Sequence, residues 1–214
     1  MQQKIKVAVI GGTGKSGKYL VQQLINQNFH FKMLVRNPDH FQNTSLNVEV
    51  VYGNVNDLNA VRSLLKDCDA VISTLGMGIP NSEPDIFSQA TKNVLQVMNE
   101  YRLTRYIVIT GLNVDTPFDD KSEKTKAATD WMKANYPKST SDKQLEYVLL
   151  SESNMEWTLV RVPMIIQTDD TGKIIESPED CPGEKISATD LALFLIRQLT
   201  DNKYVRKAPF IASE

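Results

Sequence analysis

Hydrophobic and polar positions alternate along the first half of the chain in repeated strand and helix patterns. Five short apolar runs have the length and composition of buried strands: residues 4–10, 31–35, 48–52, 70–75 and 106–110. Between them, apolar residues recur at three- and four-residue spacing and predict amphipathic helices around 19–25, 58–65 and 86–101. We therefore predict an α/β, Rossmann-type doubly wound parallel sheet with helices on both faces.

The second half of the chain is less regular. Residues 111–127 are polar and contain Pro117, which predicts a loop at the carboxyl end of a strand, where ligand-binding loops lie. The elements expected after it are a helix over 141–153, a strand over 157–162 closed by Pro163, a small hairpin within 164–175 around Asp170-Thr171-Gly172, a helix over 188–199 and a strand near 210. No repeat or linker divides the sequence, so we predict a single domain of residues 1–214 with a short C-terminal, substrate-side segment.

Composition and charge argue against several classes of function. The 24 basic and 26 acidic residues leave a net charge of −2, which gives no positive field to attract nucleic acid. No segment approaches the ~18 to 20 apolar residues of a membrane helix, and the first ten residues lack the apolar stretch of a signal peptide. We expect a cytoplasmic protein with no membrane partner, either a monomer or a homodimer.

Neither the cysteines nor the histidines predict a metal site. Cys68 and Cys181 match neither a disulfide framework nor a zinc ligand set, so two reduced thiols are expected. His30 and His40 have no second ligand at a suitable spacing.

The strongest motif is the glycine-rich segment Gly11-Gly12-Thr13-Gly14-Lys15-Ser16-Gly17, which follows the first strand and opens the first helix. In such a turn one glycine permits the tight bend, another lets the backbone approach a diphosphate, and the last lets helix and strand pack closely. Free N–H groups and the helix dipole then hold the anion. The position of the motif in a strand–helix–strand unit favours dinucleotide binding over a purely structural turn.

A P-loop does not fit the same residues. Its pattern, G-x-x-x-x-G-K-[ST], would need a glycine at Val9 in one frame and a hydroxyl at Tyr19 in the other. ATP or GTP hydrolysis is therefore disfavoured.

The end of the second strand bears on which dinucleotide binds. NAD-preferring sites place Asp or Glu there to accept hydrogen bonds from the ribose 2′-hydroxyl. This chain has Arg36 followed by Asn37 and Pro38, and a guanidinium favours the 2′-phosphate of NADP(H). The alternatives are NAD(H), which is less favoured, and a solvated surface arginine.

At this point the sequence resembles the atypical short-chain dehydrogenases/reductases, in the group of NmrA-like proteins and NADPH-dependent flavin or biliverdin reductases. Five segments in family order carry the resemblance: Ile10-Gly11-Gly12-Thr13-Gly14-Lys15-Ser16-Gly17, Leu34-Val35-Arg36-Asn37-Pro38, Tyr52-Gly53-Asn54-Val55, Val71-Ile72-Ser73-Thr74-Leu75-Gly76 and Trp157-Thr158-Leu159-Val160-Arg161-Val162-Pro163.

The resemblance implies positions for the rest of the cofactor. Asn54 and Val55 would lie alongside the adenine, and Leu75 with Gly76 would line the cofactor beyond the fourth strand. Thr110 and Gly111 would lie near the nicotinamide, over which Pro163 and Met164 would close. With the motif residues, the implied cofactor set is Gly11, Thr13, Gly14, Lys15, Ser16, Gly17, Arg36, Asn54, Val55, Leu75, Gly76, Thr110 and Pro163.

The chain departs from the family at the chemistry. Typical members use a Tyr-x-x-x-Lys pair, in which the lysine lowers the pKa of the tyrosine. Here Lys143 takes the lysine position, but Ser139 takes that of the tyrosine. Lys143 and Thr110, whose hydroxyl can bind the substrate or the carboxamide, are the candidate catalytic residues.

Three functions remain open. The first is an NADPH-dependent reductase of a planar acceptor, a flavin or a quinone, bound against the 112–118 loop with Met77, Asn113 and Met164. The second is a regulatory protein of NmrA type that senses NADP(H) without turnover, which the missing tyrosine favours. The third is a sugar-nucleotide epimerase relative, which is weaker because such enzymes need that tyrosine and a larger C-terminal domain.

Two further features favour structural roles. The mixed charges of residues 119–124 are expected to form a solvated loop. Trp131 and Tyr136 are expected on an amphipathic helix, where packing is favoured over a place at the edge of the substrate cleft.

Overall fold

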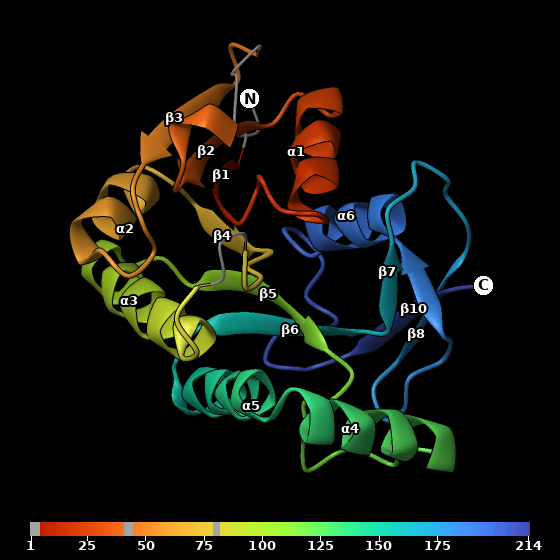
Figure 1. Cartoon of the computed structure of the whole chain (residues 1–214). Coiled ribbons are helices and arrows are strands. Elements are labelled where there is room, and N and C mark those ends of the chain that lie inside the picture. Colours follow the sequence, from red (N-terminus) through yellow and green to blue (C-terminus); the bar gives the residue numbers. More distant parts are fainter. Residues whose placement is uncertain (1–4, 41–44, 79–81) are drawn as a thin grey trace.

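The computed structural model describes residues 5–40, 45–78 and 82–214, and its centre is an eight-stranded sheet (Figure 1). The strand order is β3-β2-β1-β4-β5-β6-β10-β8, and every pair is parallel except β10 with β8. The strands are β1 (Lys6–Ile10), β2 (His30–Val35), β3 (Val48–Tyr52), β4 (Ala70–Ser73), β5 (Arg105–Gly111), β6 (Glu156–Val162), β8 (Ile174–Ser177) and β10 (Phe210–Ser213). The predicted Rossmann-type fold is confirmed. Lys4, the first residue of the predicted opening strand, lies outside the described residues.

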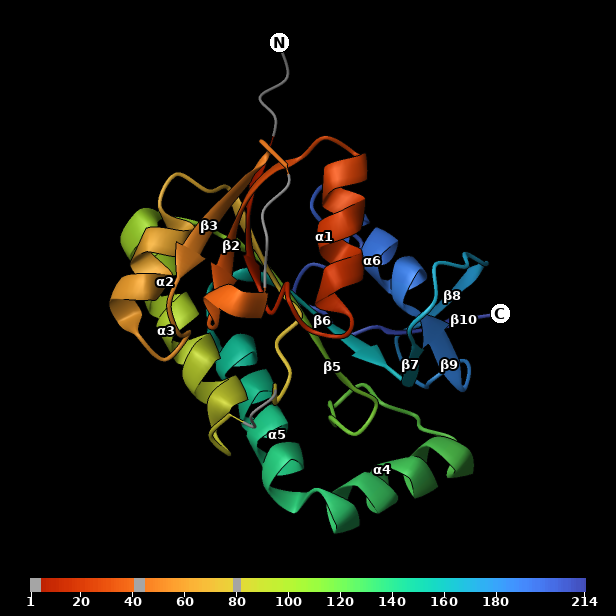
Figure 2. The same cartoon turned by 45° about the horizontal axis from the view of Figure 1, so that its top comes forward.

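Helices cover both faces of the sheet, as Figures 1 and 2 show. One face carries α1 (Gly17–Asn26) and α6 (Ala188–Arg197), and the other carries α2 (Leu58–Leu65), α3 (Ile86–Tyr101) and α5 (Pro137–Glu152). One further helix, α4 (Glu123–Asn135), packs on α5, and a short 3-10 helix spans Pro38–His40.

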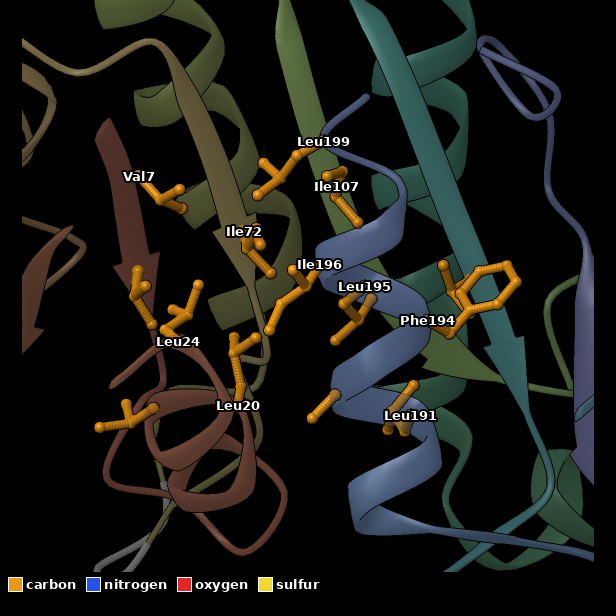
Figure 3. Packing of buried hydrophobic residues seen from close by; sticks show 14 of the residues in the cluster. Val7, Leu20, Leu24, Ile72, Ile107, Leu191, Phe194, Leu195, Ile196 and Leu199 are labelled. Atoms are coloured by element: carbon orange, nitrogen blue, oxygen red, sulfur yellow. The ribbon is translucent and has the colours of Figure 1, made fainter. Parts of the chain in front are cut away.

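The strands divide their side chains between two hydrophobic cores because successive residues of a strand point to opposite faces. In β1, Val7 and Val9 join the core beneath α1 and α6, whereas Ala8 and Ile10 join the core beneath α2, α3 and α5. Figure 3 shows the first core, in which leucines of α1 and α6 meet apolar residues of β1, β4 and β5: the labelled members are Val7, Leu20, Leu24, Ile72, Ile107, Leu191, Phe194, Leu195, Ile196 and Leu199.

The second core is held together by an unusual helix cap as well as by apolar contacts. Asp142 of α5 is buried, and its carboxylate accepts hydrogen bonds from the backbone N–H groups of Phe87 and Ser88 in the first turn of α3. A negative charge at a helix N-terminus satisfies free N–H groups and interacts favourably with the helix dipole. Asp142 therefore fixes the start of α3 against α5.

The structure corrects the predicted hairpin within 164–175. Residues 164–166 form β7 (Met164–Ile166), which pairs in parallel with β9 (Lys185–Ser187), while β8 pairs with β10. The Asp-Gly turn gave a local signal for a hairpin, but both strands find partners distant in sequence. The predicted 111–127 loop is also shorter, because α4 begins at Glu123, where Ser122 caps the helix by accepting from Thr125 N–H. The helix predicted over 141–153 begins earlier, at Pro137, a residue suited to a first helical turn.

The 119–124 run is not wholly solvated, contrary to expectation. Arg161 of β6 is fully buried, and its Nη1 lies 2.6 Å from Asp119 Oδ1. Lys121 is also buried, donates to the carbonyl of Leu112 at 3.0 Å and pairs with Asp115 at 2.6 Å. A guanidinium inside the sheet requires a counter-charge, so this loop folds inward. We call Arg161, Asp119 and Lys121 the loop anchor.

No helix in the described part of the chain is long and apolar enough to cross a membrane. Among the same residues, no group of three histidine, cysteine or carboxylate side chains is arranged to hold a metal ion. Trp131 and Tyr136 lie on the surface and contact each other edge to face, with ring centroids 5.8 Å apart.

Candidate active site

A cleft of about 820 Å³ lies at the carboxyl ends of the strands β1 to β6. Its volume is within the range of small-molecule sites. β1 lies between β2 and β4 at its centre, where the order of strands along the sheet reverses, which is the usual binding position in open α/β sheets. Most of the predicted site residues line it: Gly11, Thr13, Gly14, Lys15, Ser16, Arg36, Asn54, Val55, Leu75, Gly76, Met77, Thr110, Lys143 and Pro163.

The glycine-rich turn is tightly folded. Gly14 N–H donates to the carbonyl of Gly11 at 2.9 Å, and Gly11 has a φ of +78°, which favours glycine. A Cβ at Gly17 would lie 2.0 Å from the carbonyl oxygen of Gly11, and one at Gly11 would lie 2.6 Å from that of Thr74. Gly17 does not line the cleft, but it lets the first turn of α1 approach the loop.

The start of α1 is suited to hold an anion. Ser16 occupies the N-cap position without a side-chain capping bond, and the first turn contains no acidic residue. Within the described residues, the backbone N–H groups of Thr13, Lys15 and Ser16 find no protein acceptor. Free N–H groups together with the helix dipole form a diphosphate site, and Lys15 adds a positive charge beside it. The residues present therefore fit a dinucleotide.

Arg36 lies at the adenosine end of the cleft and contacts the loop after β4. Its Nη1 donates to Ser82 Oγ at 2.9 Å, and a Cβ at Gly78 would lie 2.9 Å from its Nη2. Gly78 thus leaves room for the guanidinium, and Ser82 orients it. Asn54 also lines this end, where its side chain accepts from Asn56 N–H at 3.0 Å.

Thr110 and Lys143 face the opposite end of the cleft. The Thr110 hydroxyl is buried and has no protein partner among the described residues. Lys143 Nζ lies 4.9 Å from the centre of the Phe87 ring. Burial lowers the pKa of Lys143 below the ordinary lysine value, and the Glu146 carboxylate opposes this shift. Lys143 is therefore a cation in an apolar wall, and it gives up its proton more readily than a surface lysine does.

The other predicted substrate residues lie away from this wall. Asn113 is buried behind Gly111, where a Cβ on the glycine would lie 2.3 Å from Asn113 Oδ1, and neither side-chain polar atom has a partner among the described residues. Met164 is 63% exposed, and none of residues 112–118 lines the cleft. The cleft that Lys143 lines includes Met77 and Thr110, together with residues not singled out in the sequence: Ile86, Ile109, Val162 and Ile165.

Some of these missed residues could have been found from the sequence. Ile109 and Val162 end predicted strands, so their place at the cleft follows from the fold. Ser82 and Ile86 carried no such signal, because they reach the cleft only through the path of the loop after β4.

A family model described as NAD(P)H-binding matches residues 11–202, which is most of the chain and includes both ends of the cleft. The chain belongs to this NAD(P)H-binding family. The resemblance to short-chain dehydrogenases/reductases inferred from the sequence motifs is confirmed at this level.

Curated relatives match over shorter stretches. Eugenol synthase 2 of Clarkia breweri is 33% identical over 87 residues, which is 36% of this chain and 28% of that protein. Phenylcoumaran benzylic ether reductase 1 of Arabidopsis thaliana is 31% identical over 99 residues, which is 41% of this chain and 32% of that protein. The matched stretch spans about a third of the length of these relatives.

Solved structures match across nearly the whole chain. The oxidoreductase ylbE from Lactococcus lactis superposes with a TM-score of 0.80 at 16% identity and covers 98% of this chain and 91% of its own. A short-chain dehydrogenase/reductase from Veillonella parvula in complex with NADP superposes with a TM-score of 0.77 at 14% identity. The match covers 98% of this chain and 94% of that protein. At such identities these matches show the shared fold.

Proposed function

We propose that this chain is an NADPH-dependent reductase of a planar acceptor, a quinone or a flavin. The observation that carries the proposal is that Lys143 and the Thr110 hydroxyl, which has no protein partner among the described residues, line the same cleft as the turn that fits a diphosphate. The surrounding wall is mainly apolar and includes Met77 and Ile86, which suits a flat, largely apolar molecule. A cytoplasmic location and a monomeric or homodimeric state belong to the same proposal.

The preference for NADPH over NADH rests on Arg36. A guanidinium forms charge-assisted, bidentate contacts with phosphate, and Ser82 and Gly78 hold this one at the adenosine end. The described cleft lining contains no carboxylate to receive a ribose 2′-hydroxyl. The NADP complex of the Veillonella parvula protein, which has the same fold, agrees with a nicotinamide cofactor.

In the proposed reaction, the glycine-rich turn and Arg36 would hold NADPH, whose chemistry would be the supply of a hydride to the acceptor. The Lys143 ammonium donates the proton that completes the reduction, so that a quinone becomes a hydroquinone, and the resulting lysine amine regains its proton from solvent. The Thr110 hydroxyl donates a hydrogen bond that orients the nicotinamide carboxamide or the acceptor oxygen. Asn113 supports this end of the cleft from behind Gly111.

A regulatory protein of NmrA type that binds NADP(H) without turnover is the second candidate. The observation in its favour is that Ser139 holds the position of the usual tyrosine, and that no tyrosine lines the cleft in the described part of the chain. An epimerase would need that tyrosine, so this third function is not proposed.

Turnover assays separate the two candidates. NADPH absorbance is followed with quinones, FMN and simple aldehydes as acceptors. The reductase predicts oxidation of NADPH with a quinone or FMN and little or none with an aldehyde. Stoichiometric binding of NADPH without oxidation by any acceptor would overturn the reductase and leave the regulatory protein.

A further inference from the structure

A buried carboxyl group lies directly behind the cleft wall and has no role in the proposed reaction as described so far. Glu146 follows Lys143 by three residues on α5, so the two side chains share one face of the helix. Glu146 is only 2% exposed, whereas Lys143 reaches the cleft. Acidic residues are almost never fully buried without a charged or hydrogen-bonding partner, so Glu146 requires an explanation.

The hydrogen bonds of Glu146 are incomplete. The Thr91 hydroxyl, from α3, donates to Oε1 at 2.9 Å, and Oε2 is buried with no partner among the described residues. Behind Thr91 lies the phenol of Tyr106 in β5, which hydrogen-bonds with the hydroxyls of Thr91 and Ser73 and is itself buried. A carboxylate that served only to hold the fold would be expected to have both oxygens satisfied.

The Lys143 ammonium, like the Glu146 carboxyl group, has fewer polar partners than a buried charge usually has. Within the described residues it makes no hydrogen bond or ion pair and contacts the face of Phe87. The neighbouring carboxylate of Asp142 is directed at the N-terminus of α3, where it accepts from Phe87 and Ser88. Glu146 is the group whose negative charge acts on Lys143.

We propose that Glu146 is a positioning residue of the reductase site, whose buried carboxyl group, once ionised, holds the Lys143 ammonium in its charged form in the apolar cleft wall and so keeps the proton donor loaded. This inference rests on the proposed function, in which Lys143 supplies the proton. After Lys143 gives its proton to the reduced acceptor, the unbalanced charge of Glu146 draws a proton from solvent back to the pair.

The electrostatics of the pair agree with this role. Burial raises the pKa of Glu146 to about 8, while the Thr91 hydroxyl and Lys143 oppose the rise and Asp142 adds to it. Burial lowers the pKa of Lys143, and Glu146 opposes the fall. Tyr106 faces Glu146 from β5, and burial holds its pKa above the ordinary value, so the phenol stays neutral. Glu146 therefore ionises above about pH 8, and there its negative charge favours the ammonium form of Lys143.

The test compares Glu146→Gln with wild type by two readouts. Glutamine has nearly the same shape, and its carbonyl oxygen still accepts from Thr91. The first readout is the pKa of Lys143, followed by NMR in protein with labelled lysine, which needs no turnover. The second is the pH profile of kcat/KM with a quinone. We expect the pKa of Lys143 and the alkaline limb of the profile both to move down by about one unit or more, the usual effect of removing a nearby opposite charge.

Companion variants make the result specific. Glu152→Gln makes the same change at an exposed position at the end of α5 and should move neither readout. Glu146→Asp keeps the charge and should restore part of both shifts. Thr91→Val removes the donor to the carboxylate, disfavours its charged form, and should cause a smaller shift in the same direction as Glu146→Gln.

Failure of this inference is distinct from failure of the proposed function. If the protein turns over and Glu146→Gln changes neither the alkaline limb of the pH profile nor the pKa of Lys143, the role of Glu146 is overturned. The proposed reductase function then still stands. A lowered pKa of Lys143 in a protein that never oxidises NADPH would support the electrostatic coupling, overturn the proposed function, and with it overturn the catalytic role of the pair.

Discussion

Two groups of buried polar residues in the described part of the chain differ in how well their hydrogen bonds are satisfied. In the loop anchor, Arg161 donates to the carbonyls of Ala208, Val114 and Pro178 and to Asp119, and its guanidinium stacks on Phe210. At the reaction end of the cleft, the Thr110 hydroxyl and Glu146 Oε2 have no partner among the described residues, and Lys143 rests on an aromatic face.

This difference distinguishes structural from chemical use of buried polarity. A satisfied network rigidifies a fold, whereas an unsatisfied buried group costs stability and is retained where a ligand or a reaction uses it. The loop anchor holds the 112–122 segment against β6, whereas Thr110 and Lys143 line the cleft and Glu146 lies directly behind its wall. Mutations in the first group should therefore affect folding, and mutations in the second should affect catalysis.

The largest expected effect is on the loop anchor. Asp119→Ala should lower the free energy of unfolding by about 3 to 5 kcal/mol, because it leaves Arg161 buried without its counter-charge. Chemical denaturation checks this value. Asp120→Ala, the same change at the exposed neighbour, is the control and should cost little. Equal stability of Asp119→Ala and Asp120→Ala would contradict the structural role assigned to the loop anchor.

Lys143→Met should lower activity and leave stability intact, the reverse of the effect expected at the loop anchor. We expect the turnover number to fall by about 10²- to 10⁴-fold, the usual contribution of a positioned proton donor. Stability should not decrease, because an apolar side chain replaces a partly desolvated cation. Turnover assays and thermal unfolding measure the two quantities, with Lys138→Met on the exposed side of α5 as the control. Loss of folding with retained turnover would contradict the assignment.

The raised pKa of Glu146 predicts a smaller, pH-dependent effect on stability. A folded-state pKa of about 8, against the ordinary glutamate value of 4.5, means that folding favours the protonated group. Its stabilising contribution is complete below the unfolded value and is lost as the pH rises through about 8. Wild type should therefore lose more thermal stability than Glu146→Gln as the pH rises across this window. If the melting temperatures of wild type and Glu146→Gln fall by the same amount as the pH rises, the raised pKa of Glu146 is contradicted.

The smallest effect is expected at the adenosine end. Ser82→Ala removes one hydrogen bond to Arg36, so NADPH binding should weaken by about 0.5 to 1.5 kcal/mol while NADH binding stays unchanged. Binding titrations with both dinucleotides measure the difference. An equal loss for both would show that Ser82 acts on the loop and not through Arg36.

The two ends of the cleft also differ in how far the sequence predicts them. The glycine-rich turn was predictable because its seven residues are consecutive in the sequence, and a Cβ at Gly17 would collide with the backbone of Gly11. The central strands β1, β2, β4 and β5 were predictable because they bury both faces in apolar runs. These local patterns were sufficient for the fold and for the diphosphate end.

The remaining features depend on contacts between distant residues. Arg36 and Ser82 are 46 residues apart, Arg161 and Asp119 are 42 apart, and Asp142 caps a helix 55 residues before it. None of these pairs has a local pattern, and the mixed charges of 119–124 therefore resembled a solvated loop. The pairing of β8 with β10 escaped prediction for the same reason.

Calorimetric titration of the protein with NADPH and with NADH measures whether the cleft binds a dinucleotide and whether it distinguishes the two. We expect one NADPH per chain, bound at least about tenfold more tightly than NADH because the 2′-phosphate accepts charge-assisted hydrogen bonds from Arg36. Arg36→Ala should remove most of that difference. Absence of binding heat with either dinucleotide, together with no NADPH protection of the protein against thermal unfolding, would contradict the assignment of the cleft.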